Sequence, residues 1–106
     1  MYQLIFYVPA SHLETVKNAV FSAGAGNFGD YDQCAWQVLG QGQFQPNTNS
    51  QPYLGQSGRL ETVPEYKVEM ICVDERIKVA VAALLAAHPY QQPAYAIYKM
   101  LEIDDL

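Results

Sequence analysis

The chain has 106 residues, which suits one domain with a single two-layer core and is too short for two. Half of its residues are hydrophobic and only 16% are charged, so the sequence predicts a globular rather than a disordered protein. The formal charge of −5 and the six scattered Lys and Arg residues argue against a nucleic-acid partner, because phosphate contacts require clustered basic side chains.

The first strand and the first helix are predicted near the N-terminus. Residues 2–8 alternate and are rich in aromatic and β-branched side chains, which is typical of a strand. Ser11 and Glu14 have the spacing of a capping box, and apolar residues then recur at helical intervals up to residue 23. Residues 24–32 are rich in glycine, which stops the helix and supplies positive φ angles, so we expect a loop there.

The middle of the chain is dominated by uncharged polar residues. A second strand is predicted at residues 34–39, and a long loop follows at about 40–58. This loop has little to bury apart from Phe44, Tyr53 and Leu54. Two interpretations are open: the loop is ordered against a neighbouring subunit by these three side chains, or it is a mobile connection between two hairpin strands.

The second half repeats the pattern of the first. Residues 59–63 are expected to extend the hairpin, and residues 66–73 alternate as a third strand. Asp74 is positioned to cap a second helix that ends at Ala87. A last strand is predicted at residues 94–101.

Residues 88–95, His-Pro-Tyr-Gln-Gln-Pro-Ala-Tyr, connect the second helix to the last strand. Proline fixes φ, lacks a backbone donor and biases the preceding residue away from helix. We therefore expect His88 to end the helix and Gln92 to be extended, which makes this segment a stiff corner.

The order strand, helix, strand, repeated twice, predicts an α+β fold of the ferredoxin-like βαββαβ type, with a four-stranded antiparallel sheet and both helices on one face. The buried positions of the two helices match at a constant spacing, which pairs Leu13 with Ile77, Val16 with Ala80, Val20 with Leu84, and Ala23 with Ala87. The other sheet face would be uncovered, and we expect four strand aromatics to line it: Tyr7, Trp36, Tyr66 and Tyr98. An uncovered apolar face indicates oligomerisation or a ligand.

Cellular location is predicted from the cysteines and from the start of the chain. Cys34 and Cys72 are widely separated without CxxC spacing, and no basic-then-apolar signal segment precedes residues 2–6. These features predict a cytoplasmic protein with free thiols, although two thiols on neighbouring strands would be able to meet. No apolar run approaches the roughly 18 residues that suggest a membrane span, so no membrane association is expected.

Three groups of residues carry a resemblance to a known family. They are the glycine-rich segment 24–34 with Tyr31, Asp32 and Cys34, then residues 40–46 with Gly55, Leu60 and Glu61, and finally His88-Pro89-Tyr90 with Pro93, Ala94, Tyr95 and Tyr98. Over almost its whole length the chain resembles the domain inserted in the middle of YqfO-type proteins of the Nif-three-like family. The resemblance implies a fold similar to the CutA and PII signalling proteins, which assemble as trimers.

The resemblance does not imply an enzyme. In the full-length family, a dimetal centre is supplied by two flanking domains with several histidines and carboxylates, whereas this chain has only His12 and His88. The family usually carries two glutamates where Gln91 and Gln92 stand here. An amide keeps the hydrogen-bonding shape and loses the charge, which disfavours a hard-cation ligand or a general base at these positions.

The corner and the glycine-rich loop supply the candidate ligand-binding residues, which are His88, Tyr90, Gln91, Gln92, Tyr95, Tyr31 and Cys34. His88 is the strongest of these, although it also has a structural interpretation, in which it interacts with the helix dipole and holds the corner. A transition metal is the cofactor that the residues suggest. Copper or zinc would suit His88 together with Cys34 or Cys72, but no set of ligands lies on one element.

Three functions remain open from the sequence. The preferred one is a non-enzymatic oligomeric module of the CutA/PII type, a dimer or trimer that binds a small ligand, a metal ion or a partner protein. The second is a copper- or zinc-handling protein that uses His88 and a cysteine. A small hydrolase has the least support, because no set of nucleophile, base and orienting residue is evident.

Overall fold

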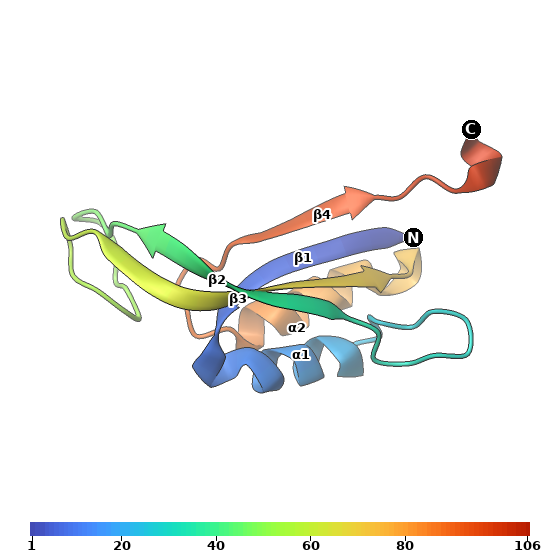
Figure 1. Cartoon of the computed structure of the whole chain (residues 1–106), viewed down its shortest axis with the longest axis horizontal. Helices are drawn as coiled ribbons and strands as arrows, with labels where there is room; N and C mark the ends of the chain where they lie inside the picture. The colour runs from blue at the N-terminus through green and yellow to red at the C-terminus, as the bar shows by residue number, and fades with distance from the viewer.

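The computed structural model describes all 106 residues, and it confirms the ferredoxin-like α+β fold. Its strands and helices are β1 Tyr2–Pro9, α1 Leu13–Ser22, β2 Trp36–Phe44, β3 Glu61–Cys72, α2 Ile77–Ala87 and β4 Tyr95–Lys99. The four strands form one antiparallel sheet in the order β2-β3-β1-β4, and both helices lie on one face of it (Figure 1).

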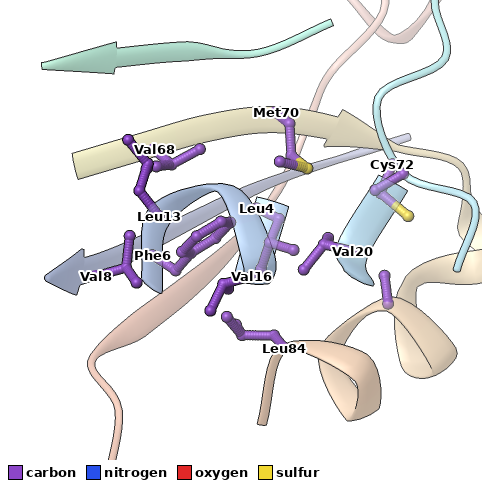
Figure 2. Close-up of a cluster of buried hydrophobic side chains, with 12 residues drawn as sticks. Leu4, Phe6, Val8, Leu13, Val16, Val20, Val68, Met70, Cys72 and Leu84 are labelled. Carbon is purple, nitrogen blue, oxygen red and sulfur yellow. The ribbon is translucent and has the colours of Figure 1, made fainter. Parts of the chain in front are cut away.

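The core lies between this covered face and the two helices. Alternate residues of β1 and β3 point toward the helices, and the pairing of Phe6 with Val68 and of Leu4 with Met70 places them side by side. The buried cluster is shown in Figure 2 and includes Leu4, Phe6, Val8, Val16, Val20, Val68, Met70 and Leu84. Full burial of such a side chain contributes about 1.5–3 kcal/mol, so this cluster is the main source of stability.

The matched helix positions predicted from the sequence are confirmed. Leu13, Val16 and Val20 are buried on α1, and Ala80 and Leu84 are buried on α2. The remaining members of the set, Ala23, Ile77 and Ala87, are partly buried and pack against the same cluster.

Both helices begin differently from the prediction. Ser11 and Glu14 form no capping box; the Ser11 hydroxyl lies 2.8 Å from His12 Nδ1, and Glu14 instead pairs with Lys17. Asp74 does not cap α2 but pairs with the N-terminal ammonium group. In each case a short 3-10 turn, Ala10–His12 or Asp74–Arg76, precedes the α-helix, so the predicted cap residue lies inside a turn rather than at a helix start.

The central hairpin is longer than the sequence indicated. β2 begins at Trp36 rather than at Cys34, and it continues through Gly40–Phe44, which was predicted as loop. These residues pair with 61–65, so the expected extension of the hairpin by residues 59–63 is confirmed from Glu61 onward, and β3 is one continuous strand from Glu61 to Cys72. Backbone pairing extends this hairpin without an apolar pattern, which is why periodicity did not reveal it. At the other end of the chain, β4 is restricted to Tyr95–Lys99.

Three of the four predicted aromatics lie on the sheet face without helices. Trp36 pairs with Glu69, Tyr7 with Lys67, and Tyr98 with Gln3, all positions that alternate with core positions. Tyr66 was placed there wrongly. It pairs with the core residue Val8 and packs against the buried cluster, because it shares the strand period of Val68 and Met70.

The molecule is elongated, with dimensions of 48 × 29 × 23 Å. Its radius of gyration of 15.1 Å exceeds the value of about 13 Å expected for a compact chain of this length. The difference arises because the β2–β3 hairpin extends beyond the helices at one end, while the C-terminal tail projects at the other (Figure 1). No helix in the chain combines the length and the apolar character that a membrane span requires.

Candidate functional site

His88 organises the corner that follows α2. The helix ends at Ala87, and His88 has an extended backbone with φ −72° and ψ 137°. Its ring is buried, with Nε2 2.7 Å from the carbonyl oxygen of Tyr7 and Nδ1 3.1 Å from the backbone nitrogen of Tyr90. Since the Tyr7 oxygen only accepts and the Tyr90 N–H only donates, the ring is neutral with its proton on Nε2. The prediction that His88 ends the helix and holds the corner is confirmed.

The structure does not bring His88 and the cysteines together. His88 contacts β1 at Tyr7, whereas Cys72 pairs with Tyr2 at the other end of the same strand, roughly 16 Å away at the usual rise per residue. Cys34 lies at that distant end as well, because its backbone N–H donates to the Gly26 carbonyl, and the Gly26 N–H donates to the carbonyl of Ile71 near the end of β3. Both thiols are free, and no group of three or more His, Cys, Asp or Glu side chains is placed to hold a metal ion.

A cavity of about 300 Å³ lies between the corner and the loop that connects β2 to β3. The corner contributes Tyr90, Gln91 and Gln92. The end of β2 and the loop contribute mainly aromatic, proline and amide side chains, among them Phe44, Pro46, Asn47, Pro52 and Tyr53. The sheet contributes Tyr7 and Glu65.

Aromatic contacts and one hydrogen bond join the loop to the corner. The ring centroids of Phe44 and Tyr53 each lie 6.1 Å from that of Tyr90, which in turn lies 4.9 Å from the His88 ring. The backbone nitrogen of Gln51 donates to Gln91 Oε1 at 2.9 Å. Two of the apolar side chains noted in the uncharged loop, Phe44 and Tyr53, therefore find their partner in the corner of the same chain.

Two polar groups in the cavity wall have no partner within the protein. The Tyr90 hydroxyl is buried and makes no hydrogen bond. Burial raises the pKa of Tyr90, and the Glu65 carboxylate beside it raises that pKa further. Glu65 forms no ion pair, and partial burial raises the pKa of its carboxyl group as well. Buried polar groups are usually paired, so these two are available to a bound molecule.

Gly42 makes room for the Glu65 carboxylate. These residues lie on neighbouring strands, and the Glu65 side chain crosses the space that a Cβ at position 42 would occupy, so that the added carbon would overlap Oε1. A glycine at this position thus allows the carboxylate to lie against the sheet at the cavity wall.

The predicted site residues fall into three places. Tyr90, Gln91 and Gln92 line the cavity, and the His88 ring packs against the Tyr90 ring. Tyr95 is on β4 and pairs with Phe6, outside the cavity. Tyr31 and Cys34 are in the loop that follows α1, at the opposite end of the sheet (Figure 1).

Sequence reasoning missed most of the cavity residues as site residues, among them Tyr7, Phe44, Tyr53 and Glu65. The isolated apolar side chains of the uncharged loop were the available signal for Phe44 and Tyr53. Nothing in the local sequence distinguishes Glu65 from other strand carboxylates, because its place in the wall depends on the pairing of β2 with β3.

The fold is that of the CutA proteins. CutA1 from Pyrococcus horikoshii matches 97% of this chain and 86% of its own length with a TM-score of 0.70, at 13% sequence identity. Nearly complete coverage in both directions shows the same arrangement of strands and helices. No model of a known protein family matches the chain.

Closer sequence relatives identify the larger proteins in which this fold occurs. A GTP cyclohydrolase 1 type 2 homolog from Mycobacterium leprae is 41% identical over 97 residues, which is 92% of this chain and 25% of the relative. The Bacillus subtilis homolog of the same name is 38% identical over 96 residues. A Bacillus cereus protein related to NIF3 has a TM-score of 0.78 and 33% identity over 92% of this chain and 24% of its own.

The chain therefore spans about a quarter of the length of the curated relatives it matches. It is homologous to one segment of these Nif-three-related proteins, and that segment has the CutA-like fold. The resemblance read from the three groups of residues is confirmed.

Proposed function

We propose that this chain is a non-enzymatic, oligomeric binding module of the CutA/PII type, which holds a small ligand in the cavity between the corner and the uncharged loop. The observation that carries the proposal is the unpartnered Tyr90 hydroxyl in the wall of this cavity, which also contains the unpaired Glu65 carboxylate. A buried polar group without a partner costs about 1–3 kcal/mol. A ligand that bonds to it would offset this cost.

The arrangement of the remaining reactive groups supports a binding role over hydrolysis. Both nitrogens of His88 are engaged with the backbone, which leaves neither free to act as a base. The Cys34 thiol has a single weak contact, to the Asp32 carbonyl oxygen at 3.9 Å, and no histidine beside it. A base within hydrogen-bonding reach is the usual means of activating a nucleophile.

The uncovered sheet face supports the oligomeric part of the proposal. Trp36 and Tyr98 are each 58% exposed and Val38 is 43% exposed, around the ion pair between Lys67 and Glu69 at 3.1 Å. Because Lys67 and Glu69 neutralise each other in the middle of this face, a second copy of the chain can cover that region without leaving either of them unpaired. We therefore propose a homo-oligomer, dimer or trimer, assembled through this face. The two free thiols also suit a reducing cytoplasm.

Native mass spectrometry of protein purified without chelator or affinity metal tests both parts at once. We expect an oligomer that gains a small mass after incubation with a deproteinised cell extract. In Ala94→Phe, whose larger side chain would fill the cavity, the extra mass should disappear, while the matched change Ala86→Phe on the exposed side of α2 should retain it. Extra mass that persists in Ala94→Phe would show that the ligand binds elsewhere.

The interface is tested by Trp36→Glu, which places an unpaired charge in the uncovered face. We expect monomers or insoluble protein, whereas Leu85→Glu on exposed helix surface should leave the oligomer intact. An unchanged oligomer in Trp36→Glu would show that subunits meet through another surface.

A further inference from the structure

The charge of the cavity restricts what it can bind. Glu65 is the one charged residue in its wall, and no Lys, Arg or His lines it. The other polar residues are amides and hydroxyls, such as Gln43, Gln92, Asn47 and Ser50. An anion would meet a carboxylate without any compensating cation, so phosphate and carboxylate ligands are strongly disfavoured.

The size of the cavity sets a second limit. Its volume of about 300 Å³ is roughly twice that of a cavity known to hold benzene, and it lies at the small end of the range for drug-sized ligands. A single ring with a short side chain fits this volume.

The two unpartnered groups indicate the polar end of the ligand. The Tyr90 hydroxyl and the Glu65 carboxylate both belong to the cavity wall, and neither forms a hydrogen bond or an ion pair within the protein. Both have oxygen atoms that accept hydrogen bonds. An ammonium group has three donors, so it can bond to both oxygens while neutralising Glu65.

The apolar part of the wall indicates the rest of the ligand. Phe44, Tyr53 and Tyr90 form a continuous aromatic surface, with centroids 6.1 Å apart in both pairs. Aromatic surfaces favour flat rings through stacked or tilted contacts, and their faces also attract cations.

We infer that the cavity recognises a small protonated amine carried on a flat ring, with the ammonium group at Glu65 and Tyr90 and the ring against Phe44 and Tyr53. This inference rests on the proposed function and adds the chemical class of the ligand. Gly42 is a specificity-determining residue in this arrangement, because it allows the Glu65 carboxylate to reach the wall.

Calorimetric titration with three matched probes tests the inference. They are 2-phenylethylamine, the neutral 2-phenylethanol and the anionic phenylacetate, which share a ring and differ in charge. We expect the amine to bind at least about ten-fold more tightly than the alcohol, and phenylacetate not to bind. Equal binding of the amine and the alcohol, or preference for phenylacetate, would overturn the inference.

Substitutions in the cavity wall test which residues bind the amine. Glu65→Gln should weaken amine binding about ten-fold or more and leave alcohol binding unchanged, since it removes the charge but keeps the shape. Glu61→Gln on the same strand, outside the cavity, is the matched control. Gly42→Ala should weaken amine binding by moving the carboxylate, and Tyr90→Phe should do so by removing one acceptor.

The outcomes separate this inference from the proposed function. If none of the probes binds but Ala94→Phe still abolishes the natural extra mass, the ligand class is wrong and the binding module stands. If Ala94→Phe changes neither the natural mass nor amine binding, the cavity is not the site and both fail.

Discussion

The two halves of the chain follow one plan up to the ends of their helices and differ from there. β1 ends at Pro9 with φ −66° and ψ 152°, and the corresponding residue after β3, Val73, has φ −67° and ψ 155°. Each is followed by a 3-10 turn and then by a helix, which begins at Leu13 in one half and at Ile77 in the other. The shared geometry shows that the same strand–helix unit is used twice.

The exits from the two helices are built differently. At the corresponding positions stand Gly24, with φ 111°, and His88, with an extended backbone. The first exit closes through backbone bonds from Gly24 and Ala25 to the end of α1. The second has one such bond, from the His88 N–H to the Leu84 carbonyl, and adds two bonds made by the imidazole ring. Only the second exit places large side chains beside the hairpin loop, and that is where the cavity lies.

Among the substitutions that separate the two exits, removal of the imidazole should cause the largest loss in the free energy of unfolding. His88→Ala leaves the Tyr7 carbonyl and the Tyr90 N–H without their partners and creates a void beneath the Tyr90 ring. Since each buried group left unpaired costs about 1–3 kcal/mol, the free energy of unfolding should fall by about 2–5 kcal/mol. Urea denaturation followed by circular dichroism measures this change.

His88→Gln is the control for the loss of the ring. Its amide can still donate toward the Tyr7 carbonyl, so we expect it to restore part of the lost stability. A free energy of unfolding for His88→Ala within about 0.5 kcal/mol of the wild type, the usual range for surface changes, would show that the ring does not hold the second exit.

At the first exit, a substitution should lower the free energy of unfolding mainly through backbone strain. Gly24→Ala puts a Cβ on a residue with φ 111°, 2.6 Å from Arg76 Nε, which donates to the Ala23 carbonyl. We expect a loss of about 2–3 kcal/mol in the free energy of unfolding from strain and the disturbed bond. Gly29→Ala is the matched control, with φ 57° and open space around its Cβ, and should cost about 1–2 kcal/mol. Equal losses in the two variants would exclude a contribution from Arg76.

Acid should weaken the second exit selectively. Burial lowers the pKa of His88 from its ordinary value of 6.5; the bond to the Tyr7 carbonyl opposes this, and His12 adds to the lowering. The unfolded chain therefore takes up the proton first, so the stability due to neutral His88 is complete above its unfolded pKa and is lost as the pH falls toward the folded value. Protonation of Nδ1 also breaks the bond from Tyr90 N–H.

Urea midpoints at about pH 7.5 and about pH 5 measure this loss. The decrease should be smaller in His88→Gln, which has no titrating ring, while carboxylate effects are common to both proteins. An equal decrease in the two proteins would assign the acid sensitivity to other groups.

The comparison also shows what the sequence could reveal. Helical period and strand alternation predicted the paired helix positions and the βαββαβ order, because those patterns follow directly from burial on one face. The extension of β2 through Gly40–Phe44 was missed, since its glycines and glutamines pair through the backbone with residues distant in sequence. The corner motif identified Tyr90 and Gln91, but Glu65 joins them only after the hairpin has formed.

The smallest expected effect concerns the link between the second exit and the hairpin loop. Gln91 accepts a hydrogen bond from the backbone of Gln51, whereas its neighbour Gln92 also lines the cavity and makes no such bond. Gln91→Ala should leave global stability within about 1 kcal/mol of the wild type, because one exposed hydrogen bond contributes about that much. The Gln51 amide should nevertheless exchange with deuterium faster, since it loses its acceptor.

NMR-detected hydrogen exchange on Gln91→Ala and Gln92→Ala compares two amide deletions one residue apart. Faster exchange in Gln91→Ala alone would show that the stiff corner orders the uncharged loop, while equal exchange would mean that the aromatic contacts of Phe44 and Tyr53 are sufficient to hold it.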